Sequence, residues 1–328
     1  MKKIYQILLI GAMIVGLASC EKDKLGDSIF IDPVEDTTIY TRAFDQWLYE
    51  NYTVPYNVEF RYRLDDNATD PNYNVVPVSL SMADTIAHLA LYLWYDVYDS
   101  VATPGFLYEN GPRIIQLIGS AMINASQGTE KIGTAEGGIK ITLMKINQMK
   151  TNDINQMNEY IFKTMHHEFS HILHQKKTLP KEFEQISAAD YNPDGWQNTD
   201  QGGSTTGEYP NSWKMGFVSD YASSQVREDF VETIANYIVK TDAQWQHMLS
   251  VAGADGKPGA DKINTKLTIC RDWLAEKWNL DIDALHEMVQ RRQANLDWDV
   301  IMSLSFMDKD KKGNGTNGGV LPPNVWPE

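Results

Sequence analysis

The strongest pattern of apolar and polar positions in the chain runs through residues 152–175. Apolar side chains recur there at the period of an α-helix and gather on one side of the helical wheel, opposite three histidines. Asn152 or Asp153 can cap this helix, and no proline or glycine interrupts it before Pro180. The pattern predicts a helix with its apolar side in a core and its histidines toward a cleft. The apolar positions are Ile154, Ile161, Phe162, Met165, Phe169, Ile172 and Leu173, and the histidines are His167, His171 and His174.

Weaker patterns predict the remaining elements and an α+β fold. Apolar and polar residues alternate most regularly in residues 139–146, and this alternation predicts a strand with one buried face and one wet face. Residues 188–216 are irregular and rich in Asn, Asp, Gly and Ser, which predicts a lid or a specificity loop. The other expected elements are helices over residues 37–52, 83–101, 227–240, 267–278 and 282–294, and strands over residues 58–63 and 113–118.

Length and charge restrict the possible partners. The chain has 328 residues, of which 42% are hydrophobic, enough for one large core or for two lobes that share a cleft. Its formal net charge is −15, and removal of residues 1–19 takes away Lys2 and Lys3 and no acidic residue, which leaves −17. This acidic balance argues against nucleic acid or an anionic membrane surface as a partner. It suits a soluble domain held in an extracytoplasmic space.

The first nineteen residues have the features of a secretory signal peptide. Lys2 and Lys3 form a positive start, and residues 7–17 form an apolar run that is short for a membrane span. Leu17-Ala18-Ser19-Cys20 resembles the lipobox of bacterial lipoproteins, which implies that Cys20 becomes the lipidated N-terminus. An ordinary cleaved signal with an incidental cysteine is the alternative. With Cys20 lipidated, Cys270 has no disulfide partner and is expected to be a small buried side chain.

The centre of the histidine helix reads His167-Glu168-Phe169-Ser170-His171. Two histidines four residues apart lie on the same side of a helix, and this spacing lets both bind one Zn²⁺. Glu168, next to the first histidine, can act as a base toward water at the metal. The alternative is a solvent-facing helix that carries histidines without function.

A catalytic zinc site needs a third protein ligand and one open position. A metzincin would have glycine at position 174 and histidine at 177, whereas this chain has His174 and Lys177, so that class is excluded. His174 lies one turn above the site and could contact the substrate or a metal ligand.

The best candidate for the third ligand is Glu228, which shares a helix face with Glu232. Two like charges four residues apart repel, so the pair favours a nearby cation. Glu228 would bind the metal, and Glu232 would accept the free ring N–H of a zinc-bound histidine. An acidic helix surface is the alternative, and Asp229 points elsewhere on the helical wheel.

These two motifs, together with the lipobox, resemble a known family. The HExxH sequence followed by Glu228-Asp229-Phe230-Val231-Glu232 is similar to the gluzincin pattern, and more narrowly to zinc-binding metallopeptidase lipoproteins found beside outer-membrane nutrient importers. Tyr221 precedes Glu228 by seven residues, as a catalytic tyrosine precedes the zinc glutamate in anthrax lethal factor. The resemblance covers about residues 164–237. It implies a zincin-like fold, with a small mixed sheet lobe, a helical lobe that carries Glu228, and the zinc site in the cleft between them.

The sequence therefore predicts a zinc-dependent hydrolase, preferably a peptidase, with one catalytic Zn²⁺. His167, His171 and Glu228 would be the ligands, Glu168 the base, and Tyr221 a hydrogen-bond donor to the tetrahedral oxyanion. By analogy with zinc proteases, residues 139–146 would supply the sheet edge that pairs with an extended peptide. Two alternatives stay open. One is a non-catalytic surface lipoprotein that binds a nutrient or partner beside an importer, and the other is a hydrolase of a non-peptide amide or ester.

The predicted organisation is a lipoprotein signal peptide over residues 1–19, a tether over 20–36, the catalytic domain over 37–310 and a flexible tail over 311–328. The mature protein would be lipid-anchored at the cell envelope, on the outer membrane. Surface exposure and a periplasmic position are both open. An outer-membrane importer would be a candidate partner.

Overall fold

The computed structural model describes residues 39–64, 74–124, 129–131, 133–136, 139–200 and 207–297. The chain divides into two units, Met1–Arg42 and Ala43–Glu328, and the fold below is that of the second unit. The predicted signal peptide, Cys20, the tether and the C-terminal tail all lie outside the described residues. Within the described part, no helix is both long enough and apolar enough to cross a membrane.

Four short strands form the main sheet in the order β1-β2-β6-β5. The first three are parallel to one another, and β5 runs antiparallel to β6. Two further strands, β3 and β4, form a separate antiparallel pair. The strands are β1 (Glu59–Arg61), β2 (Ile114–Leu117), β3 (Met122–Asn124), β4 (Thr129–Lys131), β5 (Gly133–Glu136) and β6 (Lys140–Leu143).

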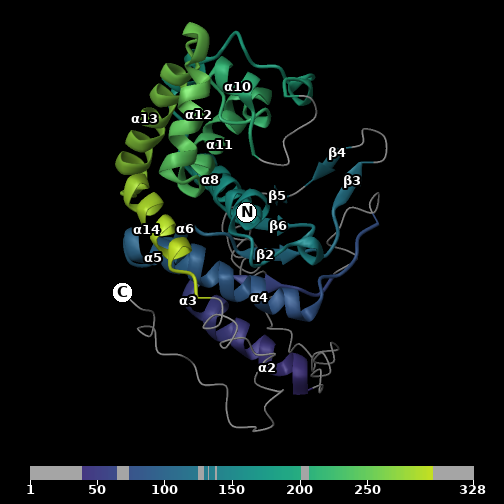
Figure 1. Ribbon diagram of the computed structural model, residues 1–328. Helices are drawn as coiled ribbons and strands as arrows, with labels where there is room; N and C mark the ends of the chain where they lie inside the picture. Colours follow the sequence, from purple (N-terminus) through teal and green to yellow (C-terminus); the bar gives the residue numbers. More distant parts are fainter. Residues whose placement is uncertain are drawn as a thin grey trace, which may run out of the picture. The chain divides into compact units, whose positions relative to one another are not determined.

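The sheet corrects two expectations for residues 139–146. β6 lies between β2 and β5, so the prediction that this segment forms the sheet edge was wrong. All four residues of β6 are buried, including Lys140 and Thr142, so the prediction of a wet face was also wrong. A parallel strand between neighbours is covered on both faces by helices, whatever its own alternation suggests. In Figure 1, α8 (Lys163–Lys176) lies next to β5 and β6, and it packs against both strands.

The helix predicted over residues 152–175 is confirmed as a continuous helical segment. It consists of α7 (Ile154–Met157), a π-helical turn η5 (Asn158–Phe162) and α8 (Lys163–Lys176). Asp153 is the cap, because its Oδ1 accepts a hydrogen bond from the backbone N–H of Gln156 at 3.1 Å. The predicted apolar side is in the core, where Phe169 contacts the rings of Trp94, Tyr98 and Phe106.

The other predicted helices are present, and the one predicted over residues 282–294 has those ends, whereas the ends of the others are shifted. The segment expected over residues 83–101 is α4 (Leu80–Ala90), η3 (Leu91–Tyr95) and α5 (Asp96–Val101). The glutamate helix is α11 (Val226–Val239), and the segment expected over 267–278 is the second half of α13 (Gly259–Trp278). Cys270 of α13 is buried, as expected. The remaining helices are α2 (Ile39–Leu48), η1 (Tyr49–Thr53), α3 (Val54–Tyr56), α6 (Phe106–Asn110), η4 (Ile146–Gln148), α9 (Lys181–Ile186), η6 (Trp196–Asn198), α10 (Pro210–Met215), η7 (Tyr221–Ser224), α12 (Asp242–Ala252), η8 (Ala254–Gly256) and α14 (Ile282–Ala294).

Candidate metal centre

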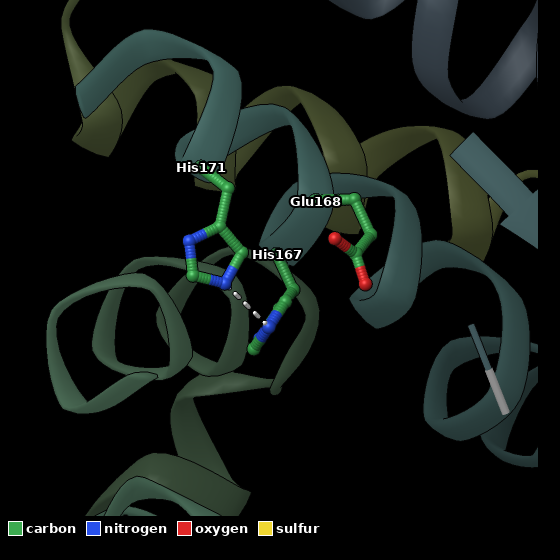
Figure 2. Close-up of side chains that lie close together, drawn as sticks. All are labelled: His167, Glu168 and His171. Atoms are coloured by element: carbon green, nitrogen blue, oxygen red, sulfur yellow. Dashed lines mark hydrogen bonds between the residues drawn. The ribbon is translucent and has the colours of Figure 1, made fainter. Parts of the chain in front are cut away.

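Two imidazoles from α8 face each other at the centre of the site. His167 and His171 are one turn apart, and their Nε2 atoms are 3.1 Å from each other. Figure 2 shows both rings turned to the same side of the helix. The side chains of His167 and His171 are only 9% and 13% exposed, because α11 packs directly against α8. The histidines therefore converge on one small space instead of facing open solvent.

Glu228 of α11 completes a triangle of donor atoms. Its Oε2 lies 3.2 Å from the Nε2 of His167 and 3.2 Å from the Nε2 of His171. Donors placed tetrahedrally at about 2.0–2.1 Å from a zinc ion are roughly 3.3 Å apart. Two imidazole nitrogens and one carboxylate oxygen at these separations fit a zinc ion. The position of Glu228 in the first turn of α11 also suits its charge, because a helix N-terminus favours anions.

Glu168 lies beside this triangle and points to another side of α8 (Figure 2). One of its carboxylate oxygens is within 4.8 Å of donor nitrogens of His167 and His171. Its side chain is buried, and burial raises the pKa of the carboxyl group, against the opposing effect of the two histidines. A carboxylate with a raised pKa next to the metal donors is suited to take up and release a proton.

The ring nitrogen of His167 that does not face Glu228 is hydrogen-bonded to a second carboxylate, that of Glu232. Its Nδ1–H donates to Oε1 of Glu232 at 2.7 Å, which leaves Nε2 directed at Glu228. The other oxygen of Glu232 accepts from the hydroxyl of Ser219 at 2.6 Å and from the amide of Asn236 at 3.1 Å. This arrangement fixes the tautomer and the plane of the His167 ring, as outer partners of metal ligands commonly do.

His171 has a different partner, the neighbouring His174. The two rings share a hydrogen bond of 2.8 Å between Nδ1 of His171 and Nε2 of His174. Burial, and then the positive charges of His171 and Arg227, lower the pKa of His174 to about 4, so this ring is neutral near pH 7. The neutral Nε2 of His174 therefore accepts the Nδ1–H of His171.

The electrostatics of the triangle favour a cation. Burial alone would lower the pKa of His167, but its hydrogen bonds with Glu228 and Glu232 outweigh burial and raise the pKa to about 10. Burial likewise would raise the pKa of Glu228, yet the two histidines hold it well below its usual value. Without metal, His167 therefore keeps a proton that is shared in hydrogen bonds with the two carboxylates. A divalent ion that binds here displaces this proton.

Comparison with known proteins shows the family to which the chain belongs. Residues 37–283 match a protein family described as "putative zinc-binding metallo-peptidase". The chain belongs to this family. A crystal structure carrying the same description, from Bacteroides caccae, is 36% identical with a TM-score of 0.65; the match covers 82% of this chain and 98% of that one. No curated protein matches the chain.

Tyr221 lies beside the donor triangle. Its ring stacks on that of His167, with centroids 6.0 Å apart. Burial, followed by the charges of Glu228 and Glu232, raises the pKa of the phenol. The raised pKa keeps the hydroxyl protonated near pH 7. The residue is 37% exposed, so it is also open to solvent. The sequence signal for Tyr221 was its spacing from Glu228.

Sequence reasoning missed three residues that contact the site. Asn236 lies one turn after Glu232 on α11, a spacing that could have indicated it. Ser219 lies in the loop before Tyr221, where no helical spacing singles it out. Trp196, in the span predicted to be a lid or specificity loop, places its ring edge against Tyr221 with centroids 5.0 Å apart.

The described part of that span is anchored beside the site. The backbone N–H of Asn192 donates to the carbonyl of Ser223 at 2.8 Å. The carboxylate of Asp200 accepts from the backbone N–H groups of Asn211 and Ser212 at 2.9 and 3.0 Å, at the start of α10. These hydrogen bonds connect residues 187–200 to the elements around the metal centre. Of the two predicted roles, they favour a specificity loop over a lid that moves.

Proposed function

We propose that this protein is a zinc peptidase in which His167, His171 and Glu228 hold one Zn²⁺. The observation that carries the proposal is the triangle of 3.1–3.2 Å between donor atoms from two separate helices. When bound, the ion would supply a Lewis acid that polarises the scissile carbonyl and makes water a better nucleophile at neutral pH. Glu232 and His174 would hold the two imidazoles in their ligand orientation.

Glu168 would be the general base. Its carboxylate lies next to the donor atoms without belonging to the triangle, so it can accept a proton from the attacking water. The raised pKa of this group favours uptake of that proton, which the carboxyl group would then pass to the leaving amine. A site that only binds metal for structure has no use for such a carboxylate, which is the argument against a non-catalytic surface lipoprotein.

A peptide is the favoured substrate because of the position of β5. This strand is hydrogen-bonded to β6 on one side, and it is an end strand of the sheet as described. It also packs against α8, the helix that carries both histidines. An extended peptide could add to β5 as a further strand and run past the metal centre. In this proposal the bound peptide would occupy the zincin-like cleft, between β5 and α11.

Tyr221 would donate a hydrogen bond to the oxyanion of the tetrahedral intermediate. Tyr221→Phe removes the hydroxyl and keeps the ring, so we expect kcat to fall by about 10²–10³-fold with zinc content unchanged. Steady-state peptide hydrolysis, with metal analysis of the same preparations, measures both quantities. An unchanged kcat would show that Tyr221 is structural. The exposed Tyr108→Phe is a matched control that should leave kcat unaltered.

We also propose that the mature protein is lipid-anchored through Cys20 at the cell envelope. The support is the lipobox-like run Leu17-Ala18-Ser19-Cys20 after an apolar segment. An acidic, soluble domain on such an anchor would meet extracytoplasmic peptides. The outer-membrane face and an importer as partner stay predictions, since they depend on the family resemblance alone.

The experiment that tests the proposed function is a peptide-library digest by the zinc-loaded protein. We expect cleavage that is abolished by a chelator and restored by added Zn²⁺. Cleavage of model amides or esters without any peptide cleavage would favour the non-peptide hydrolase. Tight zinc binding with no turnover on either class of substrate would contradict the enzyme assignment.

A further inference from the structure

A buried ion pair lies next to the metal centre, on a different side of α11 from the one that faces the histidines. Lys266 of α13 places its Nζ 2.6 Å from Oδ2 of Asp229, and both side chains are fully buried. Asp229 follows Glu228 in the first turn of α11, so the two carboxylates point in directions about 100° apart around the helix. One faces the imidazoles and the other faces Lys266.

The same ammonium group contacts a second segment. Nζ of Lys266 donates to the backbone carbonyl of Gly216 at 2.7 Å and lies 4.1 Å from the centre of the Phe217 ring. A third segment reaches the pair through Tyr191, whose hydroxyl donates to Oδ2 of Asp229 at 2.8 Å. One buried cation thus links α13, α11 and the loop that begins at Gly216, while Asp229 links Tyr191 to them.

Three of the four linked segments, all except α13, carry a group of the metal centre. Asp229 adjoins Glu228, the third donor of the triangle. The segment that starts at Gly216 leads to Ser219, which hydrogen-bonds Glu232, and to Tyr221. The loop of Tyr191 continues to Trp196, whose ring contacts Tyr221. The ion pair therefore lies where these three parts of the site are joined.

Stability alone is a poor explanation for this pair. Replacing a buried ion pair by apolar residues of similar size is often neutral or stabilising, because both charges must be desolvated. Burial lowers the pKa of Lys266 and raises that of Asp229, so each charge depends on the other. Within the described residues, Oδ1 of Asp229 has no hydrogen-bond partner, a further cost of this arrangement. A buried, costly polar group of this kind is more readily explained by the geometry that it fixes.

We infer that Lys266 is a positioning residue for the metal centre. By holding Asp229 and the carbonyl of Gly216 together, it fixes the rotation of the first turn of α11 and the course of residues 216–221. Glu228 is thereby turned toward His167 and His171, and Ser219 toward Glu232. This inference rests on the proposed zinc site, and it concerns how the donors are oriented rather than which residues react.

The test compares two charge-neutral double variants. Lys266→Met with Asp229→Asn removes the pair without leaving a buried charge alone. Arg271→Met with Asp283→Asn is the control, since it removes a partly exposed ion pair between α13 and α14, also 2.6 Å long, that does not touch the first turn of α11. Zinc affinity is measured by chelator competition, and ligand geometry by the visible absorption of the Co²⁺-loaded proteins.

We expect the Lys266/Asp229 variant to bind zinc about 10–100-fold more weakly than wild type and to show an altered cobalt spectrum. The control variant should match wild type in both readouts. A folded Lys266/Asp229 variant with wild-type affinity and spectrum would overturn the inference. Failure of the wild-type protein itself to bind zinc would instead overturn the proposed function.

A second variant keeps the test decisive if the double variant does not fold. Tyr191→Phe removes the hydroxyl that donates to Asp229 and changes no charge. We expect Tyr191→Phe to fold, to lose less zinc affinity than the Lys266/Asp229 variant, and to show a Co²⁺ absorption spectrum shifted from that of wild type. If its affinity and spectrum equal those of wild type, the network does not set the donor geometry.

Discussion

Replacing Glu168 by glutamine should leave zinc bound and lower kcat by about 10²–10⁴-fold. The amide keeps the shape and burial of the carboxylate but cannot accept a proton from the attacking water. His167, His171 and Glu228 are untouched by the change, so the donor triangle should survive. Peptide turnover and zinc content of the same preparation measure the two halves of this expectation.

The control for this variant is Glu182→Gln, which changes an exposed glutamate on α9 in the same way. It should leave turnover and zinc content at wild-type values. Retained turnover in Glu168→Gln would remove Glu168 as the base. A variant that loses both zinc and turnover would mean instead that Glu168 binds the metal.

Loss of the third donor should have the largest effect on the metal. Glu228→Ala is expected to weaken zinc binding by more than about 100-fold, since even partners outside the ligand shell commonly contribute 10–100-fold. Two imidazoles would remain, without the carboxylate that offsets the charge of the ion. Chelator competition gives the affinity, and loss of peptide hydrolysis should follow the loss of zinc.

Glu287→Ala, on the exposed side of α14, is a control that removes the same charge away from the site. Its zinc affinity should equal that of wild type. A Glu228→Ala protein that is fully loaded with zinc would refute the ligand role of Glu228. In that case another oxygen or nitrogen must complete the site.

The local features of the site could be predicted from sequence because they depend on helical spacing. Four-residue intervals place His167 and His171 on one side of α8, and they place Glu228 and Glu232 on one side of α11. The structure brings these side chains together across two packed helices. Their roles in metal binding and catalysis remain predictions, whereas the helices themselves are confirmed.

Other features depend on contacts between residues far apart in the sequence, and the local pattern of apolar and polar residues does not encode these contacts. The alternation in residues 139–146 suggested a half-exposed edge, but the antiparallel pairing of β5 with β6 made β6 an inner strand. Trp196 and Ser219 reach the site from loops whose course is set by tertiary contacts. The helix α12 was missed although its capping box, formed by Thr241 and Gln244, is a sequence signal.

Lys266 illustrates the same limit. Nothing in its sequence neighbourhood indicates a buried lysine, since α13 is amphipathic and exposes several other charged residues. Its partner Asp229 could be assigned to a different side of α11 from Glu228 by spacing alone. That these two residues meet in the core follows only from the packing of α11 against α13.

The most direct measurement is anomalous X-ray diffraction at the zinc absorption edge from crystals of the zinc-loaded protein. The account predicts one strong peak about 2.0–2.1 Å from Nε2 of His167, Nε2 of His171 and a carboxylate oxygen of Glu228. A peak bound by other residues, or Glu228 turned away from the two imidazoles with no acidic residue in its place, would contradict it.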